Sequence, residues 1–95
     1  MKLFDRKIKI DDEEFWLTID KTFNCHVNGK TFYNYECVLY KEVKSLFGVK
    51  KKAFYSYDTY WLNYPNYRGD LDKVIDDMVD HYKLWKKEQK YISDN

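Results

Sequence analysis

Residues 70–91 read DLDKVIDDMVDHYKLWKKEQKY, and the spacing of the apolar side chains in this stretch decides the fold. The apolar residues recur at steps of three and four, which places them on one stripe of an α-helix. They are Leu71, Val74, Ile75, Met78, Tyr82 and Trp85. Aspartates fill the first half of the stretch and lysines the second, an order that complements the helix dipole. The sequence therefore predicts an amphipathic helix over residues 70–91 that covers a sheet.

The residues before this helix favour strands, because aromatic residues make up 20% of the chain. Asn28-Gly29 separates two alternating runs and is typical of a two-residue hairpin turn in which both φ angles are positive. That turn pairs Cys25 with Phe32 and His26 with Thr31. We expect a core face with Phe23, Cys25, Val27 and Phe32, and a solvent face with Asn24, His26, Thr31, Tyr33 and Tyr35.

Two other segments connect the expected strands. Residues 11–14, all acidic, form a polar connector of hairpin length between two alternating runs. Residues 35–49 fit a helix that stops at Gly48, or a long strand that bends at residues 45–48 and returns through residues 50–61. The stretch has no alanine, which favours the strands, and the helix remains the alternative.

The chain is expected to form one α+β domain over residues 1–95, since 95 residues suffice for a single core. An antiparallel sheet of four to five strands occupies residues 5–64, and the loop 64–69 holds the only proline. The helix 70–91 then packs across one face of this sheet.

The sequence predicts no enzyme, no cofactor and no metal site. Its three glycines are scattered at positions 29, 48 and 69, so they form no phosphate-binding loop. Cys25 and His26 are neighbours on a strand and point to opposite faces, so they cannot act as a nucleophile and its base. Asp76, Asp77 and Asp80 lie opposite the apolar stripe of the helix, as a solvated face does. A metal-dependent enzyme at these aspartates is the third-ranked alternative.

The composition predicts a cytoplasmic protein with no membrane segment. The first ten residues carry charges where a signal peptide needs an apolar run. Cys25 and Cys37 form no CxxC motif, so we expect reduced thiols. Lys, Asn, Tyr, Phe and Ile are abundant while Ala, Gly and Arg are scarce, as in genes of low-GC bacteria and their phages.

The surplus of aromatic residues and the net charge of +1 favour a protein partner. We expect a small non-enzymatic protein-binding module from a phage or mobile element that inhibits a host protein stoichiometrically. The partner could be a nucleoprotein defence effector, which would make the chain anti-defence or anti-CRISPR-like. The predicted partner-binding residues are Tyr33, Tyr35, Tyr55, Tyr57, Lys50, Lys51 and Lys52.

Two further interpretations use the same residues or the helix. The aromatic sheet face and its lysines would also suit a single-stranded nucleic acid, with bases stacked on tyrosines. Leu84 and Tyr91 point away from the apolar stripe of the helix and are one heptad apart, so they are a predicted secondary contact or the seam of a homodimer.

Overall fold

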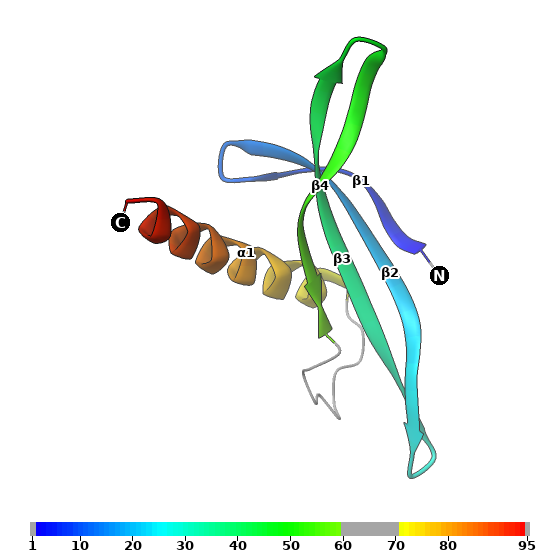
Figure 1. Cartoon of the computed structure of the whole chain (residues 1–95). Helices are drawn as coiled ribbons and strands as arrows, with labels where there is room; N and C mark the ends of the chain where they lie inside the picture. Colours follow the sequence, from blue (N-terminus) through cyan, green and yellow to red (C-terminus); the bar gives the residue numbers. More distant parts are fainter. Residues whose placement is uncertain (1, 60–70, 95) are drawn as a thin grey trace.

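A computed structural model describes residues 2–59 and 71–94, and it shows an antiparallel sheet with one C-terminal helix (Figure 1). The strands lie in chain order and are β1 (Lys2–Ile10), β2 (Glu13–Val27), β3 (Lys30–Ser45) and β4 (Gly48–Asp58). The helix α1 spans Leu71–Asp94. The α+β class is confirmed. The helical interpretation of residues 35–49 is wrong, because β3 runs to Ser45 and β4 begins at Gly48.

Several predicted boundaries change. The helix continues to Asp94 instead of ending at residue 91, and Asp70 and the loop 64–69 lie outside the described residues. The first hairpin turn is only Asp11-Asp12, with φ of 55° at Asp11, because the two following glutamates already belong to β2. The turn at Asn28-Gly29 is confirmed, with φ of 51° and 76°.

The core lies between α1 and one face of the sheet, which we call the helix face. The predicted apolar stripe of the helix is confirmed, since Val74, Met78 and Tyr82 are buried and the other three members pack against them. The buried apolar residues are Ile10, Phe15, Leu17, Ile19, Tyr35, Cys37, Leu39, Tyr57, Val74, Met78 and Tyr82. The opposite, outer face of the sheet carries no helix in the described part of the chain.

A bulge at Asn24 changes which side chains share a face. Phe23 pairs with Tyr33 but Cys25 pairs with Phe32, so Asn24 is the extra residue, and its amide donates a 2.9 Å hydrogen bond to the Asn34 side chain. The expected core face was therefore wrong. Phe23 and Tyr33 lie on the helix face beyond the helix, where Phe23 is 65% exposed, and Cys25 turns to the outer face.

A second bulge, in β4, builds the aromatic contact between sheet and helix. Tyr55 pairs with Leu39 and Ala53 pairs with Tyr40, so Phe54 is extra and both Phe54 and Tyr55 reach α1. We call Phe15, Phe54, Tyr55, Tyr82 and Trp85 the aromatic cluster. Tyr82 is its centre, with ring centroids 5.2 Å from Phe15 and 5.4 Å from Tyr55. This cluster fixes the helix against β2 and β4.

Ion pairs fasten the middle of α1 to the first hairpin. Lys83 lies 3.5 Å from Asp11, and Lys86 pairs with Glu13. These pairs are partly exposed, so each contributes about 0–1 kcal/mol and serves mainly to fix the direction of the helix.

In the described part of the chain, no helix combines the length and apolar character needed to cross a bilayer.

Both cysteines are free, as the sequence predicts, and they differ in burial. Burial raises the pKa of the Cys37 thiol to about 12, while Cys25 is only partly buried. The thiolate is the reactive form of cysteine. We therefore expect a disulfide reagent at pH 8 to modify Cys25 rapidly and Cys37 slowly in the folded protein. Cys25→Ala should abolish the fast reaction and Cys37→Ala should preserve it, as followed by absorbance. Equal rates for the two thiols would contradict the burial of Cys37.

Candidate interaction site

The turn between β3 and β4 consists of two large apolar residues that contact solvent. Leu46 is 99% exposed and Phe47 is 93% exposed. Figure 1 shows this hairpin extending beyond the rest of the sheet, with the turn at its far end. Val43 and Val49, one on each strand, are also exposed. We call Val43, Leu46, Phe47 and Val49 the apolar tip.

The other two hairpins show how unusual this turn is within the chain. They use Asn28-Gly29 and Asp11-Asp12, residue types that tolerate positive φ and are well solvated. The β3–β4 turn places its positive φ of 122° on Gly48, which leaves the two turn positions open to other residue types. Leu and Phe at those positions add no packing in the fold, so their apolar surface is available for binding.

The turn is held in one shape by a serine. The Ser45 hydroxyl donates a 3.0 Å hydrogen bond to the Gly48 carbonyl oxygen and accepts a 3.3 Å bond from the Phe47 N–H. Side-chain bonds of this kind are typical of tight turns. The backbone of the turn that carries Leu46 and Phe47 is therefore held by bonds within the hairpin itself.

The base of the hairpin is fixed on the helix face of the sheet. The Lys41 ammonium lies 3.1 Å from a Glu13 carboxylate oxygen and 4.1 Å from the centre of the Phe54 ring. Glu13 is also paired with Lys86 of the helix. One carboxylate thus connects the helix, the first hairpin and the base of the β3–β4 hairpin.

The β3–β4 hairpin is also attached to β1 and β2 on the outer face of the sheet. The Lys51 ammonium sits 3.2 Å above the centre of the Trp16 ring, and the Trp16 indole N–H donates a 2.5 Å hydrogen bond to Asp5. Lys7 and Glu42 form a second link at 3.6 Å. The hydrogen bond from Trp16 lowers the pKa of Asp5, with a smaller contribution from the Lys2 charge. The hairpin is held on both faces up to residue 51.

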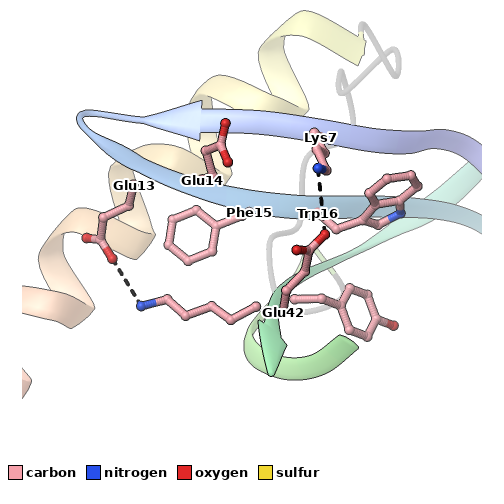
Figure 2. A pocket seen from close by; sticks show the side chains of 8 residues that line it. Lys7, Glu13, Glu14, Phe15, Trp16 and Glu42 are labelled. Atoms are coloured by element: carbon pink, nitrogen blue, oxygen red, sulfur yellow. Dashed lines mark hydrogen bonds and ion pairs between the residues drawn. The ribbon is translucent and has the colours of Figure 1, made fainter. Parts of the chain in front are cut away.

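A hollow lies where the first hairpin separates from the β3–β4 hairpin, and Figure 2 shows the Lys7–Glu42 pair in its lining. The Lys41–Glu13 pair also belongs to this lining. Its lining residues are Lys7, Glu13, Glu14, Phe15, Trp16, Tyr40, Lys41 and Glu42. This lining includes no serine, cysteine or histidine side chain. Both lysines are already paired, and the hollow is better suited to fixing the hairpin than to binding a charged ligand.

The predicted partner-binding tyrosines do not form one exposed surface. Tyr35 and Tyr57 are buried in the core, which corrects their predicted place on the surface, and Tyr55 is half-buried in the aromatic cluster. Tyr33 is 42% exposed, with the Lys21 ammonium 4.0 Å from its ring centre. Tyr35, Tyr55 and Tyr57 are covered because they lie on the face of the sheet against which α1 packs.

The predicted lysines remain exposed but do not form one patch. Lys50, Lys51 and Lys52 are consecutive on β4, so they alternate between the two faces of the strand. Lys51 is on the outer face over Trp16, while Lys50 pairs with Val43 and Lys52 pairs with Lys41. Leu46 and Phe47 are not among the predicted partner-binding residues. The signal that could have found them is two apolar residues between Ser45 and Gly48, where a turn usually has polar ones.

The predicted secondary contact is solvent-exposed on α1, where Leu84 and Tyr91 are joined by Ile92. The helix aspartates lie on its polar side, where Asp77 is 3.9 Å from Lys73 and its carbonyl oxygen accepts a 2.8 Å hydrogen bond from His81 Nδ1. Within residues 2–59 and 71–94, no group of three or more His, Cys, Asp or Glu side chains could hold a metal ion.

Comparison with protein-family models, with curated proteins and with solved structures finds no match to this chain.

Proposed function

We propose that the chain is a protein-binding module whose apolar tip inserts into a partner protein and which acts stoichiometrically, without catalysis. The observation that supports this is the near-complete exposure of Leu46 and Phe47 at the end of a fixed hairpin. Burying two such side chains in a partner would supply most of the binding energy of a small interface.

The residue types at the tip favour a protein over a nucleic acid. Three of the four exposed residues are aliphatic, and stacking on bases needs aromatic rings. The tyrosines that could have stacked bases are mostly packed against α1. A partner with an apolar pocket is the better match to the tip.

The test compares capture by tagged wild-type protein and by the Leu46→Ser/Phe47→Ser variant in nuclease-treated lysate of a low-GC bacterium. Anchor residues of an interface cost about 2 kcal/mol or more when truncated, so the variant should bind the captured protein at least roughly 30-fold more weakly. Its stability should stay within about 0.5 kcal/mol of the wild type, because neither side chain packs in the fold.

Leu84→Ser/Tyr91→Ser is the matched control, since it removes a similar amount of exposed apolar surface from the helix. This control should retain the partner. Loss of capture by the helix variant with retention by the tip variant would move the site to α1. Capture seen in a parallel untreated lysate but lost in the nuclease-treated lysate would reassign the partner to nucleic acid.

The finer form of the proposal is an inhibitor of a host protein, acting in the cytoplasm of a low-GC bacterium and encoded by a phage or mobile element. Its support is the small size, the A+T-rich composition and the absence of a recognisable catalytic motif in the sequence. Size-exclusion chromatography of the protein with purified defence effectors, including CRISPR effectors, tests it. Co-elution at a fixed ratio with loss of effector activity is the expected result, and no shift with any effector would contradict it.

A further inference from the structure

Three exposed lysines lie on the two strands that carry the apolar tip. Lys44 is beside the turn on the outer face, where it pairs with Val49, while Lys50 and Lys52 lie on the helix face of β4. We call Lys44, Lys50 and Lys52 the lysine collar. At about 3.3 Å per residue along a strand, Lys44 and Lys50 start within about 7 Å of the turn, so their flexible side chains can reach the level at which Leu46 and Phe47 would enter a pocket. Lys52 starts about 7 Å farther along β4, opposite Lys41, where it can meet the outer part of the same rim.

The collar differs from the other two lysines of this part of the hairpin, Lys41 and Lys51. Lys41 is paired with Glu13 and Lys51 lies over Trp16. Glu42, the one acidic residue between positions 41 and 52, is paired with Lys7. The collar lysines form no ion pair within the described part of the chain. The end of the hairpin therefore carries positive charge that the fold itself does not neutralise.

We infer that the lysine collar pairs with carboxylates on the rim of the partner's apolar pocket, so that the partner is an acidic-rimmed protein surface. This inference rests on the proposed function of the tip. Complementary charge around an apolar centre is the usual anatomy of a protein interface, where it raises the association rate and fixes the orientation. The unequal division of the collar, two lysines on one face and one on the other, would set which way the hairpin enters.

The fixed shape of the turn favours a protein rim over the phosphates of a lipid surface. The two hydrogen bonds of Ser45 hold Phe47 and Gly48 in one geometry. Order that exists before binding increases affinity for a pocket of defined shape, because less conformational freedom is lost on association. A fluid bilayer has no such pocket and would gain little from that order.

A carbodiimide, which joins a lysine amine directly to a carboxylate in contact with it, tests the inference in the nuclease-treated lysate. Mass spectrometry should find peptides of the captured protein linked through Asp or Glu to the collar lysines. Lys9, Lys87 and Lys90 are the internal control, because they are also exposed and lie on β1 and α1, away from the tip. Links to these three at the same yield would overturn the inference.

The triple variant Lys44→Gln/Lys50→Gln/Lys52→Gln gives a second readout. It should bind the captured protein about tenfold more weakly at low salt, as expected for three exposed ion pairs, and should lose most of the salt dependence. The matched variant with glutamine at positions 9, 87 and 90 should bind like the wild type. Wild-type affinity of the collar variant would overturn the inference.

A photo-crosslinking phenylalanine analogue at position 47 separates the two proposals. Crosslinks from position 47 to a captured protein, without carbodiimide links from the collar, would overturn the acidic rim and leave the proposed function standing. Absence of any protein crosslink would overturn both. Retention on vesicles of phosphatidylglycerol and phosphatidylcholine, or on a thymidine oligonucleotide, with no protein captured, would assign the tip and collar to phosphate groups instead.

Discussion

Tyr82→Ala should lower the free energy of unfolding by about 3–5 kcal/mol, the usual cost of removing a buried aromatic side chain. Tyr82 is 1% exposed, and its ring lies 5.2 Å from Phe15 and 6.3 Å from Phe54. It is the side chain through which the helix contacts both β2 and β4. Urea denaturation followed by circular dichroism measures the loss, which would be a large fraction of the stability of a 95-residue domain.

Two variants show whether the loss comes from packing. Tyr82→Phe keeps the ring and removes a buried hydroxyl that has no hydrogen-bond partner among the described residues, so its stability should equal or exceed that of the wild type. Tyr91→Ala changes an exposed tyrosine on the same helix and should stay within about 0.5 kcal/mol. A large loss in Tyr91→Ala, or none in Tyr82→Ala, would mean that the aromatic cluster does not hold the helix.

The helix stripe and the Asn28-Gly29 hairpin could be predicted because each depends on a local rule. The spacing of Val74, Met78 and Tyr82 repeats with the period of a helix, and only a few residue types accept the positive φ of a tight turn. Both rules act within a few residues, so tertiary context does not change their outcome.

The bulges at Asn24 and Phe54 could not be predicted, because neither is marked by a glycine. Asn24 and Phe54 are ordinary strand residues, and each becomes the extra residue through pairing with distant parts of β3. One extra residue moves every later side chain to the other face. That is why Cys25 lies on the outer face, and why Phe54 and Tyr55 both reach the helix.

The candidate site at Leu46 and Phe47 could not be predicted from the sequence for a related reason. Hydrophobic patterns predict burial, so Leu46 and Phe47 suggest a core position until the strands on either side are known to end there. The lysines of the same hairpin could be predicted as binding residues from the sequence. Only the pairing of β3 with β4 shows that Lys51 lies over Trp16 on one face, while Lys50 and Lys52 lie on the other face.

The stability of the fold should fall as the pH rises above about 8.5, because the core favours the neutral, protonated forms of a cysteine thiol and of tyrosine hydroxyls. Burial raises the pKa of the Cys37 thiol to about 12, and it also raises the pKa of Tyr35, Tyr55 and Tyr82. Below about pH 8.5 the Cys37 thiol is protonated in both states, so its contribution to stability is constant. Above that pH the unfolded chain loses the proton first, so the unfolded state is favoured.

The expected size of this effect follows from the thiol alone. An unfolded cysteine titrates near pKa 8.5, so stability should drop by about 1.4 kcal/mol per pH unit above that value, or about 2 kcal/mol by pH 10. The buried tyrosines add a loss of the same sign above about pH 10, where unfolded tyrosines ionise. Urea midpoints from pH 7 to pH 10 measure the slope. Cys37→Ala removes the ionisable group, so its curve should be nearly flat up to pH 9.5, and an unchanged slope in that variant would assign the alkaline loss to other groups.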